Sequence, residues 1–284
     1  MKLPPTFLAR RFGTVLALSM VLMASIVLRG AGKNIYDESK ERVRFLGRSM
    51  DLWCAKPANP RSPTFLIIFA SGDGGMHGVS KATYKHMADQ GYYVGAYSSR
   101  QALKRVKSTG QFMSFPEAAS SISRLMQEAR RLLGLPESTP VVVSGISRGA
   151  SMVVFAAGEP SLQPRICGAV AIALTRESDY MNPPPPGERG SSIQLDKKGR
   201  ILLYPALARL GSIPIAVIES MHDSYVNAAE SRRLMGPDTP TRRLYEVQAD
   251  NHSFGGGREQ LFRDLDEALS WIASTIKAPG PTPR

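Results

Sequence analysis

The sequence predicts an α/β fold in which a mostly parallel central sheet is covered by helices on both faces. Two observations lead to this prediction. Segments with strand character alternate with segments of helical periodicity, and several of the strand-like runs are apolar throughout. The alternation is typical of parallel sheets with crossover helices, and such runs are typical of strands buried on both faces. At 284 residues, 43% of them hydrophobic, the chain can form one large domain.

The predicted elements follow one another in a regular order. The polar residues 32–42 indicate a linker or a short irregular segment, and residues 43–57 predict one or two opening strands. The further strands are predicted at residues 64–71, 92–99, 141–147, 166–175, 213–220 and 243–249, and the helices at residues 79–90, 115–134, 149–158 and 258–277.

The first 32 residues differ from the rest of the chain. Lys2, Arg10 and Arg11 precede an uncharged apolar run at residues 12–28. This pattern predicts a secretory signal peptide or an uncleaved signal anchor at residues 1–32, because a basic start followed by an apolar run is typical of both. We therefore expect an exported protein, periplasmic or anchored to the inner membrane and facing the periplasm. An α/β domain at residues 33–278 and a disordered tail at residues 279–284 would follow.

The chain carries a formal net charge of +12. Residues 1–32 contribute +4 of it, from three arginines and one lysine with no acidic residue, which leaves +8 (12 − 4) for the rest. A basic exported protein is suited to an anionic membrane surface or an anionic substrate. Nucleic acid is not an expected partner, because no RNA-binding signature or zinc-finger spacing is present. Nothing in the sequence predicts an oligomeric state.

The chain has two cysteines, Cys54 and Cys167, each inside a strand-like segment. Export would permit a disulfide between them, but these positions favour buried free thiols. Their spacing matches neither a metal site nor a redox motif. No metal and no cofactor are expected.

One long interruption, residues 176–212, separates two of the predicted strands. The four consecutive prolines at residues 183–186 exclude a helix or a central strand there. We expect a lid or cap over the carboxyl edge of the sheet, with a short helix near residues 203–210. A disordered surface excursion is the alternative.

The most informative motif is Gly-x-Ser-x-Gly at Gly145, Ser147 and Gly149. It lies where a β-branched run meets a segment of helical character, which is the context of the nucleophile elbow of α/β-hydrolases. At such a turn the serine hydroxyl projects above the sheet, and the helix that begins there directs its N–H groups toward developing negative charge. Ser147 is therefore the candidate nucleophile.

A serine hydroxyl needs a base, and the base needs a group that orients it. In an α/β-hydrolase these follow in the order serine, acid, histidine, each after a later strand. Asp223 follows the strand predicted at residues 213–220, and His252 follows the last strand. Asp223 is the candidate acid, with Glu219 and Asp250 as nearby alternatives, and His252 is the candidate base.

The same chemistry requires donors for an oxyanion. One should be the backbone N–H of Arg148, the residue after the nucleophile, and the other should come from the loop after the first buried strand. That loop is glycine-rich and spans residues 71–78. Gly72 or Asp73 is the candidate second donor. The loop lacks the Gly-Lys-Ser/Thr ending of a phosphate-binding loop.

Five segments together resemble the VirJ-type bacterial virulence proteins. They are SGDGG, YSSRQAL, GISRGA, LYPALARLGSIPIAVI and NHSF, and the resemblance runs from about residue 62 to residue 275. Members of that family are exported proteins of the α/β-hydrolase type with a serine, aspartate and histidine triad, and some are periplasmic hydrolases of aminoacyl esters of phosphatidylglycerol. The resemblance implies that Ser147, Asp223 and His252 are the catalytic residues and that the substrate is an ester at the inner membrane.

The chain departs from the family at the mouth of the expected site. The family usually has an aromatic residue where Met76 stands, and aromatic residues where this chain has the basic segment 101–107. These differences affect the predicted substrate more than the predicted chemistry.

The sequence thus predicts an exported serine hydrolase that cleaves a carboxylic ester, with an aminoacyl-phospholipid as one candidate substrate. A peptidase or an acyltransferase with the same triad is one alternative. A binding protein or secretion-system partner that keeps the fold without turnover is another.

Overall fold

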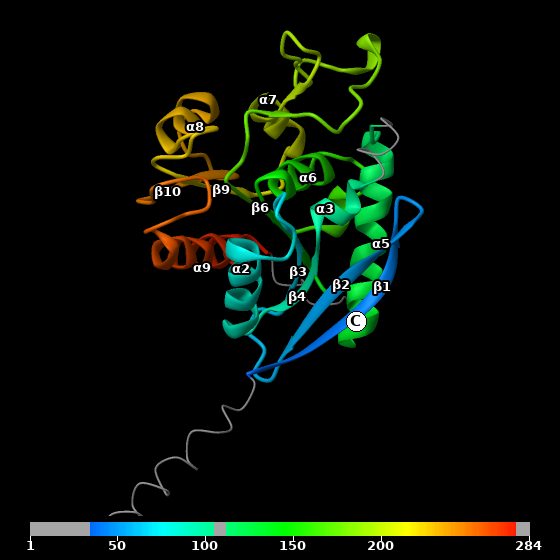
Figure 1. The fold of residues 1–284 in the computed structure, drawn as a ribbon. Coiled ribbons are helices and arrows are strands. Elements are labelled where there is room, and N and C mark those ends of the chain that lie inside the picture. The colour runs from blue at the N-terminus through cyan, green and yellow to red at the C-terminus, as the bar shows by residue number, and fades with distance from the viewer. Residues whose placement is uncertain (1–34, 105–111, 277–284) are drawn as a thin grey trace, which may run out of the picture. The chain divides into compact units, whose positions relative to one another are not determined.

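The computed structural model describes residues 35–104 and 112–276 (Figure 1). The predicted leader at residues 1–32 and the predicted tail at residues 279–284 lie outside the described residues. Within these described ranges no helix is both long and apolar enough to cross a membrane. Nor do three or more His, Cys, Asp or Glu side chains gather there in a way that could hold a metal ion.

The centre of the fold is an eight-stranded sheet with the strand order β1-β2-β4-β3-β5-β6-β9-β10. The pairs β1–β2 and β2–β4 are antiparallel, and all other neighbours are parallel. The prediction of a mostly parallel sheet is thus confirmed. The strands are β1 (Tyr36–Phe45), β2 (Arg48–Pro57), β3 (Leu66–Ala70), β4 (Tyr93–Tyr97), β5 (Val141–Ile146), β6 (Gly168–Ile172), β9 (Ile215–Ser220) and β10 (Arg242–Val247).

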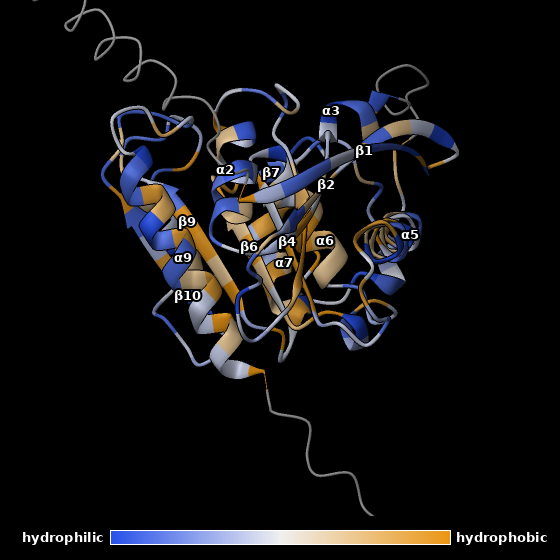
Figure 2. Ribbon diagram, turned by 90° about the horizontal axis from the view of Figure 1, so that it is seen from below, coloured by the Kyte–Doolittle hydropathy of each residue, from blue (hydrophilic) through white to orange (hydrophobic). Residues whose placement is uncertain are grey.

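Helices cover both faces of this sheet, as predicted (Figure 1). Buried residues of α5 (Phe115–Leu133) and α6 (Arg148–Ala157) form one apolar cluster with one face of the sheet. Those of α2 (Gly78–Asp89) and α9 (Arg258–Thr275) form a second cluster with the other face. Successive residues of β3 alternate between the two clusters, as expected of a strand buried on both sides. Figure 2 shows the hydrophobic residues concentrated along the central strands.

The helix ends agree with their local sequences. Ser114 and Glu117 form a capping box at the start of α5, and Gly134 ends that helix in a left-handed conformation (φ 68°). Three short elements complete the main body: α3 (Ser99–Ala102), α8 (Ala228–Met235) and the 3₁₀ helix η1 (Gln163–Arg165).

The prediction of an irregular segment at residues 32–42 was wrong for its described part, because β1 begins at Tyr36. The strand lies at the edge of the sheet, and residues 37–42 are all exposed, so no alternation of polar and apolar residues marks it. Ion pairs connect it to β2 instead. Lys40 Nζ and Arg42 Nη1 lie 3.2 and 3.1 Å from the carboxylate of Asp51, whose pKa is held below its ordinary value by hydrogen bonds from Gln101 and these two cations, despite partial burial.

Residues 176–212 fold into a small ordered unit. The unit contains the antiparallel strands β7 (Glu177–Ser178) and β8 (Ile201–Leu202), helix α7 (Leu203–Ala206) and the 3₁₀ helices η2 (Pro186–Glu188) and η3 (Leu207–Leu210). Helix α7 confirms the short helix expected near residues 203–210. The buried ring of Tyr180 packs edge-on against Phe155 of α6, with the ring centroids 6.3 Å apart. A disordered excursion is therefore not observed, and the role of a lid stays a prediction.

The cysteines are free thiols. Cys54 is buried in β2, and Cys167 lies directly before β6 with its Sγ 3.3 Å from the carbonyl oxygen of Val141. Burial raises the pKa of both thiols to about 12. Neither cysteine therefore has the character of a reactive thiolate.

The junction between β5 and α6 is built on very close backbone contacts. A Cβ atom at Gly145 would lie 2.4 Å from the carbonyl carbon and oxygen of Gly149. A Cβ atom at Gly149 would lie 2.2 Å from the carbonyl oxygen of Ala70 in β3. The sequence pattern Gly-x-Ser-x-Gly is thus a steric requirement, because only residues without a Cβ atom let the first turn of α6 approach the sheet this closely.

Replacement of Gly149 by alanine should destabilise the fold by about 2 kcal/mol or more, because the new methyl group must displace the backbone of β3. Gly187→Ala is the matched control. Its Cβ atom would have no neighbour within 4 Å and its φ is not positive, so we expect a change of less than about 0.5 kcal/mol. Urea denaturation measures both values. Equal stabilities of the two variants would contradict the steric argument.

Candidate active site

Ser147 occupies a strained position at the start of α6. It is the N-cap residue of the helix and has φ 56° and ψ −118°. Such a conformation in a non-glycine residue costs on the order of 1–3 kcal/mol and persists only where the surroundings impose it. Here the Ser147 N–H donates to the carbonyl oxygen of Ile172 at 2.8 Å, which ties the turn to the end of β6. The strain holds the hydroxyl above the carboxyl edge of the sheet.

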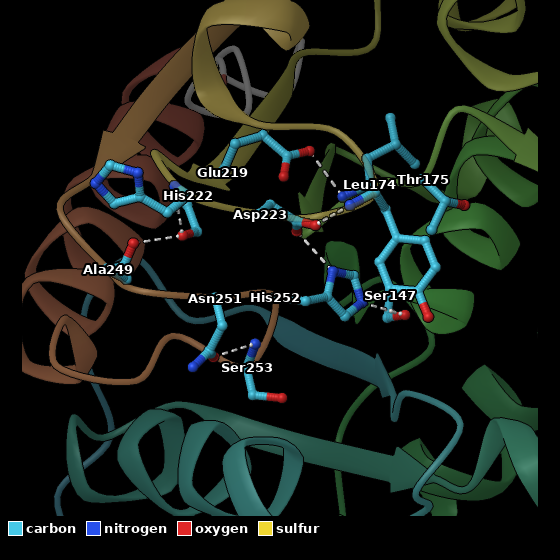
Figure 3. Close-up of polar contacts among 12 residues, drawn as sticks. Ser147, Leu174, Thr175, Glu219, His222, Asp223, Ala249, Asn251, His252 and Ser253 are labelled. Atoms are coloured by element: carbon cyan, nitrogen blue, oxygen red, sulfur yellow. Dashed lines mark hydrogen bonds and ion pairs between the residues drawn. The ribbon is translucent and has the colours of Figure 1, made fainter.

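The imidazole of His252 lies between Ser147 and Asp223 (Figure 3). Its Nε2 is 2.8 Å from Ser147 Oγ, and its Nδ1 is 2.6 Å from Asp223 Oδ2. The carboxylate accepts a hydrogen bond, so we assign the ring hydrogen to Nδ1. Nε2 is then left to accept the hydroxyl hydrogen of Ser147. The three side chains predicted from the sequence are thus brought into one hydrogen-bonded chain, although they come from three separate loops.

The Asp223 carboxylate is almost fully enclosed, with its side chain 1% exposed. Its Oδ1 accepts a hydrogen bond of 2.7 Å from the N–H of Tyr225, and its Oδ2 faces His252. The two alternative carboxylates do not take this place. Glu219 points to the N–H of Leu174 (Figure 3), and Asp250 is exposed, with its Oδ2 beside Gly256.

Other residues, which the sequence did not single out, support the histidine loop. Asn251 Oδ1 accepts from the N–H groups of Ser253 and Gly255 at 2.9 and 3.2 Å, and so closes the turn around His252. The ring of Tyr225 lies 4.7 Å from the imidazole and is 65% exposed. An Asn directly before the histidine was the only local signal for this support, because asparagine side chains favour such turns. His222 is exposed and lies away from this group (Figure 3).

The loop after β3 lies beside the nucleophile. A Cβ atom at Gly72 would be 3.5 Å from the Cβ of Ser147. The N–H of Gly72, however, donates to Ser80 Oγ at 3.1 Å, so it is not free to bind an oxyanion. The prediction of Gly72 as an oxyanion donor was therefore wrong. The N–H groups of Asp73 and Arg148 have no hydrogen-bond partner among the described residues. They remain the candidate donors.

A cleft of about 800 Å³ is lined in part by residues 74–77 of the same loop. Ser147, Asp223 and His252 do not line it. Its walls include Met76 and the cationic side chains Lys81, Arg100 and Lys104. The cleft is therefore a neighbour of the candidate site rather than the site itself.

Glu219 is a second carboxyl group close to the site, and it is completely buried. Its Oε1 accepts from the Leu174 N–H at 2.7 Å and from the Tyr204 hydroxyl at 3.3 Å, while Oε2 has no partner among the described residues. Burial, and then the charge of Asp223, raise the pKa of Glu219 well above its ordinary value. The raised pKa favours the protonated form of this buried carboxyl group.

This raised pKa makes the stability of the fold depend on pH. Above pH 4.5, the ordinary value, Glu219 ionises in the unfolded chain while it keeps its proton in the folded one. The free energy of unfolding should therefore fall as pH rises from there through the folded-state pKa. Glu219→Gln cannot ionise, so its stability relative to the wild type should improve as pH rises over this window. Denaturation at a series of pH values measures the difference, and parallel profiles would contradict the assignment.

No family model matches the chain, and no curated protein matches its sequence. Solved structures do match. A protein assigned as a dienelactone hydrolase from Klebsiella pneumoniae subsp. pneumoniae has 15% sequence identity and a TM-score of 0.60, over 84% of this chain and 99% of that one. Est1E from Butyrivibrio proteoclasticus has 15% identity and a TM-score of 0.56, over 82% of this chain and 99% of that one.

A third match is the acylaminoacyl peptidase of Pyrococcus horikoshii, with 16% identity and a TM-score of 0.59. It covers 92% of this chain but only 44% of the peptidase. Identities this low establish the fold alone. Taken with the sheet order and the turn at Ser147, these matches show that the chain has the α/β-hydrolase fold.

Proposed function

We propose that the protein is a serine hydrolase that cleaves a carboxylic ester through an acyl-enzyme on Ser147. The observation that carries the proposal is the continuous hydrogen-bonded chain from Ser147 Oγ through His252 to the enclosed carboxylate of Asp223. Nothing in the packing of a binding protein requires a strained serine with a histidine base directly against its hydroxyl. Proteins with this fold that are described as an arylesterase and as an esterase domain add support.

The geometry suits acyl transfer. Ser147 Oγ attacks the carbonyl carbon while His252 Nε2 takes its proton, and Asp223 stabilises the imidazolium that forms. Negative charge develops on the carbonyl oxygen, which accepts hydrogen bonds from the N–H groups of Arg148 and Asp73. The carbon–oxygen bond to the alcohol then breaks, and His252 returns the proton to the departing oxygen. Water, deprotonated by His252, attacks the acyl-enzyme in the same way and releases the acid.

The substrate that we propose is an ester presented at an anionic membrane, such as an aminoacyl-phospholipid. Three features support it. The first 32 residues have the pattern of an export signal, the rest of the chain carries +8, and the segments described above resemble the VirJ-type family. The cleft beside the loop after β3 is lined by four lysine and arginine side chains and by two carboxylates, Glu38 and Asp51, and this excess of positive charge is suited to an anionic headgroup.

The chain without residues 1–32 should hydrolyse short nitrophenyl esters, and Ser147→Ala should lower kcat by about 10³-fold or more. Asp223→Asn should lower it by a similar factor, because the asparagine amide no longer holds the His252 tautomer that accepts the hydroxyl proton. Ser161→Ala, an exposed serine outside the site, is the matched control and should leave kcat within about twofold of the wild type. Release of nitrophenolate measures all four proteins.

The same preparation should be offered an aminoacyl-phosphatidylglycerol in anionic vesicles and a blocked peptide. A higher kcat/KM for the lipid than for the nitrophenyl ester supports the proposed substrate, and cleavage of the peptide alone favours a peptidase. Folded protein that turns over none of them would contradict the assignment as a hydrolase.

A further inference from the structure

The two candidate oxyanion donors are also joined to each other by their side chains. Nη1 of Arg148 lies 2.6 Å from Oδ1 of Asp73. Arg148 is the first residue of α6, and Asp73 lies in the loop that follows β3. The pair therefore bridges the two segments that must converge on one substrate oxygen.

The bridge is largely sheltered on the arginine side. The Arg148 side chain is 14% exposed, its Nη1 is out of contact with solvent, and the contact to Asp73 lacks the angle of a linear hydrogen bond. Asp73, at 56% exposure, is the only acidic group within ion-pair distance of Arg148 in the described part of the chain. An enclosed cation with one counter-charge is costly to leave alone, so this contact should hold the Asp73 side chain in place.

The backbone around Asp73 is already held in place. The carbonyl oxygen of Gly72 accepts hydrogen bonds from Ser71 Oγ, Ser99 Oγ and the Gly75 N–H, at 3.0 Å each. Because the peptide unit is planar, the fixed Gly72 carbonyl also fixes the direction of the Asp73 N–H. The ion pair with Arg148 therefore acts on the carboxylate of Asp73 and not on its amide.

We propose that the Arg148 guanidinium compensates the Asp73 carboxylate, whose negative charge would otherwise oppose the oxyanion that the two backbone amides bind beside Ser147. The contact also ties the loop after β3 to the first turn of α6. The two side chains are not required to touch the substrate. The inference rests on the proposed esterase function.

The test is a double-mutant cycle with Arg148→Met, Asp73→Ala and the combined variant, assayed on a neutral nitrophenyl ester. Removal of a single oxyanion donor costs about 10²–10³ in kcat, and an uncompensated carboxylate beside the oxyanion should cost on the order of tenfold. We expect Arg148→Met to show that loss with KM within threefold of the wild type. In the Asp73→Ala background the same substitution should cost less than about threefold, because its partner is already absent.

Two further readouts separate charge compensation from a merely structural role. The inhibition constant of a boronic acid, which mimics the tetrahedral intermediate, should rise in proportion to the loss of kcat/KM across the series. Arg148→Lys, which keeps the charge, should recover part of that loss. Arg131→Met, which breaks the exposed Arg131–Glu128 pair of α5 (2.8 Å), is the control for deleting a guanidinium and should change neither constant.

Three results would overturn the proposal. Full additivity of the two substitutions would mean that they act independently. Unchanged boronic acid affinity in Arg148→Met would separate the arginine from the oxyanion. A rise in KM for anionic esters but not for neutral ones would make Arg148 a substrate-binding residue instead. A wild type without turnover is a different outcome, because it contradicts the esterase function and not the coupling of these two residues.

Discussion

The site depends on the close approach of α6 to the end of β3. Without Cβ atoms at Gly145 and Gly149, the first turn of the helix rests on the backbone of Ala70. Ala70 is paired with Gly145 in the sheet and is followed by the glycine-rich loop. One contact therefore brings together the hydroxyl of Ser147, the first amide of α6 and the loop that holds Asp73. A helix displaced by the width of a methyl group would separate them.

The sheet order supplies the remaining groups. β5, β6, β9 and β10 are successive parallel neighbours, so the loops at their carboxyl ends share one edge. Asp223 follows β9 and His252 follows β10, which places an acid and a base beside the turn after β5 although 105 positions separate Ser147 from His252. Both buried carboxyl groups accept hydrogen bonds, Asp223 from the Tyr225 N–H and Glu219 from the Leu174 N–H, but Glu219 Oε2 has no partner among the described residues. Burial, and then the charge of Asp223, raise the pKa of Glu219.

The sequence was sufficient for the α/β architecture and for the three side chains that meet at the site, because both follow from order along the chain. It failed for residues 36–42 of β1, which carry no alternating pattern and are connected to β2 by ion pairs with Asp51. It also left the second oxyanion donor open between Gly72 and Asp73. The hydrogen bond that excludes Gly72 is donated by its N–H to Ser80 Oγ, and only the folded loop brings that oxygen to it. The Arg148–Asp73 contact was hidden for the same reason.

The central claim is that Ser147 is a nucleophile activated by His252. Peptide mass spectrometry after treatment with a fluorophosphonate tests it most directly. The account predicts one phosphonyl adduct on the peptide that contains Ser147, formed rapidly by the wild type and about 10³-fold more slowly by His252→Ala. An adduct on a different residue, or equal labelling rates with and without the imidazole, would contradict it.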